Sequence, residues 1–159
     1  MLRVITTNLN GIRSAQRKGF HEWAAAQGAD FICVQEIKAT EADIPDEMRR
    51  IGELDGHFHT AEKKGYSGVG IYCRRPPERL IAGFGDEEFD VEGRYLEAVY
   101  PDLAVVSLYL PSGSSSPERQ EAKYRFMERF LVHLQKLRER GLEVIICGDW
   151  NIAHKEIDL

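Results

Sequence analysis

Short polar side chains follow three apolar runs of this sequence, at the point where each run ends. Asn8 comes after the first run, Glu36 after the second, and Asp149 with Asn151 after the last. Ligands of open α/β sheets bind outside the carboxyl ends of the strands, so these side chains can meet in one cleft. Asp149 and Asn151 alternate to the same side of an extended chain, so both can address one phosphate or one metal ion.

These residue types offer only oxygen ligands, which suit Mg²⁺ or Mn²⁺ bound through one or two carboxylates, water and a substrate phosphate. A single glutamate at a strand end is usually a solvated edge residue. Four such residues at three equivalent strand ends favour a metal and phosphate site. His57 and His59 imitate a metal-binding pair, but no further Cys or His spacing supports one. No histidine has an adjacent partner that would mark it as a general base.

Tyr109 ends another apolar run, beside a loop rich in Ser and Gly at 111–117. A tyrosine in a strand next to proline is usually a packing residue, but the neighbouring loop leaves open that its hydroxyl reaches a phosphate. Lys63–Gly68 reads either as a solvated basic turn or as a contact to a phosphate backbone. Arg13 and Lys38 suit the same contact, and charge alone does not separate the two interpretations.

Length and composition predict one globular domain, because 159 residues with 43% hydrophobic content can bury a core. The formal net charge of −5 gives no overall attraction to nucleic acid, so DNA binding would need a local basic patch. Cys33, Cys73 and Cys147 fall in predicted strands without Cys-x-x-Cys spacing, which indicates free thiols in a reducing compartment. We recognise no signal peptide, transmembrane run or lipidation motif, so we expect a cytoplasmic protein with no membrane partner.

The first half of the chain predicts a strand, a helix and a second, parallel strand. The strand Leu2–Thr7 is followed by a turn and by a helix that runs to about Gln27, and Asp30–Gln35 forms the next strand. This βαβ unit implies a right-handed crossover between parallel neighbours. A short polar helix over Glu41–Gly52 and a weak strand over His57–Ala61 come next.

The second half predicts an antiparallel meander, a long helix and a last strand. The meander strands are Val69–Cys73, Arg79–Phe84, Tyr95–Tyr100 and Ala104–Tyr109. A charged amphipathic helix over Pro117–Arg140 leads into the strand that ends before Gly148. The mixture predicts an α/β sandwich with a sheet in which the first strands and the last strand run parallel. No repeat or low-complexity linker marks a domain boundary.

Six short motifs stand along the chain in a fixed order. They are Thr7–Arg13, Gln35–Lys38, Gly65–Gly70, Gly93–Glu97, Tyr109–Gly113 and Gly148–Asn151. Together they resemble the exodeoxyribonuclease III branch of the endonuclease/exonuclease/phosphatase superfamily, over the whole of the chain. The resemblance implies a four-layer α/β sandwich of which this chain carries about the first half. It also implies action on double-stranded DNA at abasic sites and 3′ ends, with a divalent cation.

The resemblance assigns roles to the residues at the strand ends. Asn8 and Glu36 match the metal site of the family, with Glu36 as the principal ligand, and Asp149 and Asn151 complete the set. Tyr109 matches the phenol that contacts the scissile phosphate. Asp149 matches the aspartate that either orients or deprotonates the attacking water or protonates the leaving group. Asn151 matches the amide that holds a phosphate oxygen.

The resemblance further implies contacts to DNA. These are at Arg13, Lys38, Lys64, Tyr66, Ser67, Arg94, Ser112 and Gly113. Asn10 stands where some members have aspartate, so a possible second metal ligand is absent or the metal affinity is changed.

Family members are longer than this chain, and their later part supplies the second half of the sandwich and an Asp-His pair. We therefore expect residues 1–159 to be the N-terminal portion of a single domain. A lone half would expose an apolar face, so it should associate with a complementary C-terminal half or with itself. The isolated portion should be nearly inactive, because a cooperating catalytic set has lost members.

The leading functional hypothesis is a Mg²⁺-dependent DNA-repair phosphodiesterase, with Mn²⁺ as the alternative metal. Its activities would be abasic-site endonuclease, 3′–5′ exonuclease or 3′-phosphatase. Two alternatives stay open. One is a phosphoesterase for inositol or lipid phosphates, since the superfamily shares this metal edge, although the segments Asn10–Arg13 and Tyr109–Gly113 favour DNA. The other is a non-catalytic fragment that binds DNA or dimerises.

Overall fold

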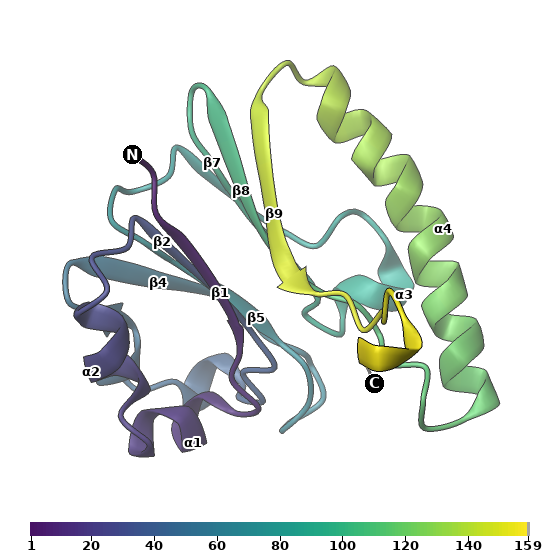
Figure 1. Ribbon diagram of the computed structural model, residues 1–159, viewed down its shortest axis with the longest axis horizontal. Helices are drawn as coiled ribbons and strands as arrows, with labels where there is room; N and C mark the ends of the chain where they lie inside the picture. The colour runs from purple at the N-terminus through teal and green to yellow at the C-terminus, as the bar shows by residue number, and fades with distance from the viewer. Residues whose placement is uncertain (159) are drawn as a thin grey trace.

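The computed structural model describes residues 1–158 as two β-sheets that pack against each other, with helices on both outer faces (Figure 1). Helices α1 and α2 cover one sheet, and the long helix α4 covers the other. These four layers confirm the fold class expected from the sequence.

The first sheet has the strand order β1-β2-β5-β4-β3, and only β1 and β2 are parallel. Its strands are β1 (Val4–Asn8), β2 (Phe31–Gln35), β3 (Arg50–Ile51), β4 (Leu54–His59) and β5 (Val69–Cys73). The second sheet has the order β6-β7-β8-β9, and only β8 and β9 are parallel. Its strands are β6 (Arg79–Ala82), β7 (Tyr95–Val99), β8 (Leu103–Tyr109) and β9 (Glu143–Asp149).

The helices are short except for one. They are α1 (Ile12–Arg17), α2 (Phe20–Ala25), α3 (Glu87–Asp90) and α4 (Pro117–Glu139), with 3₁₀ turns at Glu41–Asp43, Asp46–Met48 and Glu156–Asp158. Ser116 caps α4 by accepting a hydrogen bond from the Arg119 amide, and Pro117 occupies the first helical turn. Among residues 1–158, no helix combines the length and the apolar character that crossing a membrane requires.

The alternation of side chains along β2 explains the two inner core layers. Phe31 and Cys33 point into the space between the sheets, whereas Ile32 and Val34 point toward the layer of α1 and α2. All five residues of β2 are buried, because β2 has sheet neighbours on both sides and packing on both faces. A third layer joins the second sheet to α4 and includes Phe126.

Two predicted helices are interrupted. The helix expected up to Gln27 is divided at Gly19, which adopts a left-handed conformation with φ of 83°. The polar helix expected over Glu41–Gly52 is replaced by two 3₁₀ turns and the short strand β3. Pro45 accounts for this break, since a proline disfavours helical geometry in the residue before it. The weak strand predicted over His57–Ala61 is β4, which begins three residues earlier.

The predicted meander is divided between the two sheets. β5 pairs antiparallel with β2 and β4 in the first sheet, and only β6, β7 and β8 form a meander. The dipeptide Pro76-Pro77 lies in the connection that carries the chain from one sheet to the other. The expectation that the first and last strands share one sheet is therefore wrong, because β1 and β9 lie in different sheets.

Two sheets lie within the described chain and pack against each other, so their inner faces cover one another except at the edge strands, where Thr6 of β1 is exposed and Cys147 of β9 is partly buried. The expectation of one bare apolar sheet face does not fit this arrangement. What the described residues leave open are sheet edges, because β1 and β9 each have a strand neighbour on one side only. Two apolar side chains in the elements before and after β9 are also exposed: Leu131 of α4 at 57% and Ile152, three residues after the strand, at 51%.

We predict that the 159-residue chain self-associates through these edges, since an unpaired edge flanked by apolar side chains is a template for pairing. Sedimentation velocity over a range of concentrations should give a rising mass, and Leu131→Glu should weaken the association. Glu128→Gln on the same helix is the control and should leave it unchanged. A stable monomer at high concentration would contradict the prediction.

Candidate active site

The carboxyl ends of the two parallel strand pairs meet at one place. In the first sheet Asn8 is paired with Gln35, so Asn8 and the following residue Glu36 end side by side. In the second sheet Tyr109 is paired with Asp149, and both are the last residues of their strands. The side chain of Asn8 reaches that of Asp149 across the gap between the sheets, with an Nδ2–Oδ2 distance of 2.9 Å.

Hydrogen bonds join these four side chains into one cluster, which we call the strand-end cluster (Asn8, Glu36, Tyr109 and Asp149). Asn8 Nδ2 donates to Glu36 Oε1 at 2.9 Å as well as to Asp149. The Tyr109 hydroxyl donates to the same Glu36 oxygen at 2.7 Å. The structure therefore brings together four of the residues that the sequence placed at separate strand ends.

Glu36 is held as a carboxylate by its partners. Burial acts to raise the pKa of Glu36, but hydrogen bonds from Lys38, Asn8 and Tyr109 outweigh it and leave the pKa below its usual value. Lys38 Nζ lies 2.8 Å from Glu36 Oε2. Burial, and then the hydrogen bond to Glu36, raise the pKa of Tyr109 well above its ordinary value. At neutral pH the cluster therefore presents an ionised glutamate and a neutral phenol donor.

The loops around Glu36 have a constrained backbone. Asn10, Glu36 and Lys38 have φ angles of 46°, 51° and 47°, in the left-handed region that non-glycine residues rarely adopt. The Asn10 amide nitrogen donates to Asn8 Oδ1 at 2.9 Å, and Lys38 Nζ donates to Asn10 Oδ1 at 2.5 Å. Asn10 thus links the strand-end residue Asn8 to the cation of Lys38. Such strain persists where the surrounding contacts fix the conformation.

Asn151 does not continue the alternation of β9. The strand ends at Asp149, and Asn151 turns with a φ of 50°. Its backbone amide donates to Asp149 Oδ1 at 3.0 Å, and its Nδ2 donates to the Leu110 carbonyl at 2.8 Å. Asn151 therefore lies next to the strand-end cluster but is held by a turn, and not on the same face of an extended strand.

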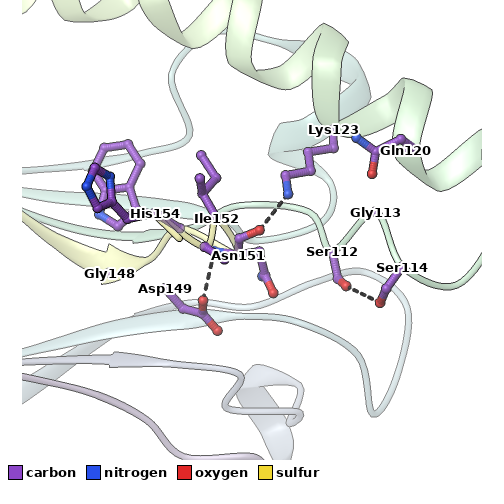
Figure 2. Close-up of a pocket in the computed structure, with 12 residues that line it drawn as sticks. Ser112, Gly113, Ser114, Gln120, Lys123, Gly148, Asp149, Asn151, Ile152 and His154 are labelled. Atoms are coloured by element: carbon purple, nitrogen blue, oxygen red, sulfur yellow. Dashed lines mark hydrogen bonds between the residues drawn. The ribbon is translucent and has the colours of Figure 1, made fainter. Parts of the chain in front are cut away.

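A cavity of about 710 Å³ adjoins Asp149. It lies between the 112–114 loop, the first turns of α4 and the segment after β9 (Figure 2). Lys123 extends from α4 toward this segment, and its Nζ donates to the Asn151 carbonyl at 2.5 Å. Sequence reasoning did not select Lys123, since one lysine on a charged helix carries no signal until the helix is placed.

The donor set fits a hard divalent cation in part. Glu36 and Asp149 supply two carboxylates, which is the ligand chemistry that Mg²⁺ uses together with water and phosphate. The side-chain oxygens of Asn8 and Asn10 are already hydrogen-bonded, to the Asn10 amide and to Lys38 Nζ, and Asn8 turns its nitrogen toward the two carboxylates. No group of three or more His, Cys, Asp or Glu residues suited to a metal occurs within residues 1–158. His59 Nδ1 lies 2.8 Å from the Tyr95 carbonyl oxygen. This ring nitrogen therefore contacts the backbone and is not available to bind a metal ion.

The residues expected to contact DNA divide into exposed and buried sets. Arg13 is exposed, the side chain of Lys64 is 75% exposed, and Ser112 is partly buried beside Gly113 near the cavity. Ser67 and Arg94 are each only 2% exposed. The role of direct DNA contact does not fit these two side chains, because β7 and the 62–68 loop carry them into the interior.

Tyr66 is intermediate between the two sets. It is partly buried, and its hydroxyl accepts hydrogen bonds from Arg94 and Arg119. Its ring lies 5.3 Å from Lys63 Nζ, measured to the ring centroid. The hydroxyl is therefore committed to the interior.

The family model described as "Endonuclease/Exonuclease/phosphatase family" matches residues 5–159. The chain belongs to this family. This match confirms the family that the six sequence motifs resemble.

Named relatives in this family are nucleases. The chain is 32% identical over 160 residues to "DNA repair nuclease APEX1" of Danio rerio, covering 99% of this chain and 51% of the relative. It is 33% identical over 159 residues to "Exodeoxyribonuclease" of Bacillus subtilis (strain 168), covering 99% of this chain and 62% of the relative. The chain therefore spans between half and two thirds of the length of these relatives.

A solved structure agrees with the fold. "Structure of an AP Endonuclease from Archaeoglobus fulgidus" superimposes with a TM-score of 0.83 and 28% identity, covering 99% of this chain and 60% of that one. The agreement extends over both sheets, because nearly all of the chain is covered. Nucleases of the endonuclease/exonuclease/phosphatase family generally depend on a divalent metal ion.

Proposed function

We propose that the domain containing this chain is a Mg²⁺-dependent phosphodiesterase of DNA repair, which cleaves double-stranded DNA at abasic sites and removes groups from 3′ ends. The observation that carries the proposal is the strand-end cluster, in which two carboxylates, an amide and a phenol from two sheets are joined by hydrogen bonds. The names of the relatives as DNA repair nuclease and exodeoxyribonuclease support DNA as the substrate.

In this proposal Glu36 and Asp149 would hold the metal ion, with the side-chain oxygens of Asn8 and Asn151 as further ligands. A bound Mg²⁺ supplies charge neutralisation at the phosphate and a more acidic water. The Tyr109 hydroxyl, which donates to Glu36 Oε1 in this structure, would redirect its single proton to a non-bridging phosphate oxygen when substrate binds, and the raised pKa keeps the phenol protonated. Asp149 either accepts a proton from the attacking water or donates one to the leaving oxygen. Asn151 aids phosphate binding through its amide.

We further propose that residues 1–159 form the N-terminal portion of a single domain. Coverage of 51% and 62% of two curated relatives supports a longer domain. The strand-end cluster contains no histidine, so the remainder would supply the opposing general base or phosphate-activating histidine. Mn²⁺ is proposed as a substitute for Mg²⁺, since both accept oxygen ligands.

The proposed location is the cytoplasm. Cys33 and Cys73 are buried free thiols, and Cys147 is a partly buried one, which suits a reducing compartment. The proposed partner is duplex DNA, approached through the exposed basic residues Arg13 and Lys64.

The proposal is tested by incubating the complete domain with a fluorescent duplex that carries one abasic-site analogue. With the 3′ ends blocked against exonuclease action, cleavage at the analogue with Mg²⁺, loss of cleavage with a chelator, and no internal cut in an undamaged duplex are expected. Soluble inositol phosphates are the competing substrates. Their hydrolysis, with the abasic duplex left uncut, would contradict the proposal.

The same assay applied to the isolated 159-residue chain should give a rate lower by about three orders of magnitude or more. Removing members of a cooperating catalytic set has effects of that size. The complete domain at equal concentration is the control. Ordinary turnover by the isolated chain would show that these residues already contain the whole catalytic set.

A further inference from the structure

Arg94, the residue directly before β7, is a buried cation behind the strand-end cluster. It is 2% exposed, yet all parts of its guanidinium group have partners. Nε donates to Glu92 Oε2 at 2.5 Å, Nη1 donates to the Tyr109 carbonyl at 3.1 Å, and Nη2 donates to the Tyr66 hydroxyl at 2.8 Å. Buried charges are rare unless they are paired in this way, so the position of Arg94 is strongly specified.

Arg94 holds Tyr109 at its ring and at its backbone. The guanidinium carbon lies 4.9 Å from the centroid of the Tyr109 ring, within the range of a cation–π contact. The Tyr109 amide donates to the Arg94 carbonyl at 2.9 Å, which reciprocates the bond from Nη1. The far end of Tyr109 is its hydroxyl, which donates to Glu36. Arg94 thus contacts the backbone and the ring of Tyr109, and the Tyr109 hydroxyl contacts the proposed metal ligand Glu36.

Arg119, in the first turn of α4, is a second cation that contacts two of the partners of Arg94, Tyr66 and Glu92. Its Nη2 donates to the Tyr66 hydroxyl at 2.5 Å, and its Nη1 lies 3.4 Å from Glu92 Oε1. Arg94 and Arg119 share one carboxylate, so the group behind Tyr109 carries a net positive charge. In a poorly solvated setting that charge favours an anion in front of the ring.

The local sequence forces Arg94 inward. Gly93 has a φ of 61°, and a Cβ on it would lie 2.6 Å from the His59 carbonyl oxygen. Only glycine fits this close approach of the two backbones. The chain therefore enters β7 against the end of β4, and both Arg94, just before the strand, and Tyr95, its first residue, are buried.

We propose that Arg94 is a positioning residue for the Tyr109 phenol, and that with Arg119 it supplies positive charge behind the site that receives the phosphate. This role takes the place of the direct contact with DNA that the family resemblance implied for Arg94. It rests on the proposed function for the role of the phosphate, whereas the control of Tyr109 by Arg94 does not depend on the reaction. Burial and Glu36 raise the pKa of Tyr109, and the charge of Arg94 acts in the opposite direction.

The first test needs no activity. In the 159-residue chain with ¹³C-labelled tyrosine, exchange of the Tyr109 hydroxyl proton is measured from the deuterium isotope effect on the Cζ signal. We expect Arg94→Gln to speed this exchange at least ten-fold relative to Arg140→Gln. Arg140 is the matched control, since it also pairs with a buried carboxylate, Glu97, but is not among the recorded partners of Tyr109.

Two milder variants are included in case Arg94→Gln does not fold. Arg94→Lys keeps the charge but cannot make the three hydrogen bonds, so we expect an intermediate exchange rate. Tyr66→Phe removes only one acceptor and should give a smaller effect in the same direction. Exchange in Arg94→Lys and Arg94→Gln equal to that in the Arg140→Gln control would overturn the proposal.

The second test uses the complete domain and the abasic duplex. We expect Arg94→Gln to lower kcat at least ten-fold with KM changed less than three-fold, and Arg94→Lys to recover part of the loss. In a Tyr109→Phe background the effect of Arg94→Gln on kcat should fall below three-fold, because residues that act through one group are not additive. An equal loss in both backgrounds, or a loss confined to KM, would overturn the proposal. If no form of the domain cuts DNA, the proposed function fails, and the exchange measurement alone decides the role of Arg94.

Discussion

Replacing Asp149 by asparagine should lower the rate of abasic-duplex cleavage by the complete domain about 1,000-fold, within the range of 10²–10⁴ typical for a group that transfers a proton. Asp149 receives hydrogen bonds from Asn8 and from the Asn151 amide, so its position is fixed by both sheets. Asparagine keeps the shape but removes the charge and the capacity to take a proton. Cleavage rates at saturating substrate measure the effect directly.

The control for this change is Asp102→Asn. Asp102 is an exposed residue before β8, at the opposite end of the strand from Tyr109. We expect it to leave the cleavage rate within two-fold of the wild type. A rate for Asp149→Asn within ten-fold of the wild type would exclude Asp149 from proton transfer and from essential metal binding.

Replacing Glu36 by glutamine should weaken binding of Mg²⁺ or Mn²⁺ about 100-fold, and cleavage should fall with it. Changes in the partners of a metal ligand already cost about 10–100-fold, so loss of the principal carboxylate belongs at the upper end of that range. The structure keeps Glu36 ionised through Lys38, Asn8 and Tyr109, and each of these partners would face a neutral amide in the variant. Isothermal titration with Mn²⁺ measures the affinity.

Glu41→Gln is the matched control for Glu36. The side chain of Glu41 is 61% exposed and pairs with Arg49, which lies outside the strand-end cluster. Its replacement should change the Mn²⁺ affinity less than two-fold. Equal affinities of the wild type and Glu36→Gln would mean that the metal binds elsewhere or not at all.

The strand ends were the part of the site that the sequence could predict. Asn8, Glu36, Tyr109 and Asp149 each follow a short apolar run, and local pattern is enough to place such residues at the ends of strands. That all four would meet depends on the packing of two sheets, which no local pattern encodes. The family resemblance supplied that information, and the hydrogen bonds between the four side chains agree with it.

The sheet to which a strand belongs was less predictable. β5 and β6 are both short apolar runs separated by a turn, which is the pattern of a hairpin, yet they lie in different sheets. The outcome depends on β5 filling the place between β2 and β4, a contact between residues far apart in the sequence. The DNA contact that the resemblance implied for Arg94 does not fit its burial, and the residues that surround it come from distant parts of the sequence.

The prediction that Asp149 and Asn151 lie on the same side of an extended strand was wrong for a different reason. The prediction assumed an extended chain up to Asn151, whereas the strand ends at Asp149 and the Asp149 carboxylate accepts the Asn151 amide in a turn. Short polar side chains often hydrogen-bond to the backbone two residues further on, which competes with extended structure. The two residues remain neighbours, but through a turn of the chain.

In the proposed function, the ends of the two sheets form one divalent-metal site. Paramagnetic broadening by Mn²⁺ in the NMR spectrum of the 159-residue chain tests it most directly. At substoichiometric Mn²⁺, the signals of Asn8 and Glu36 in the first sheet and of Asp149 in the second should broaden together, and Glu36→Gln should remove the effect at both. Broadening confined to one sheet, or centred on His57 and His59, would contradict a shared site.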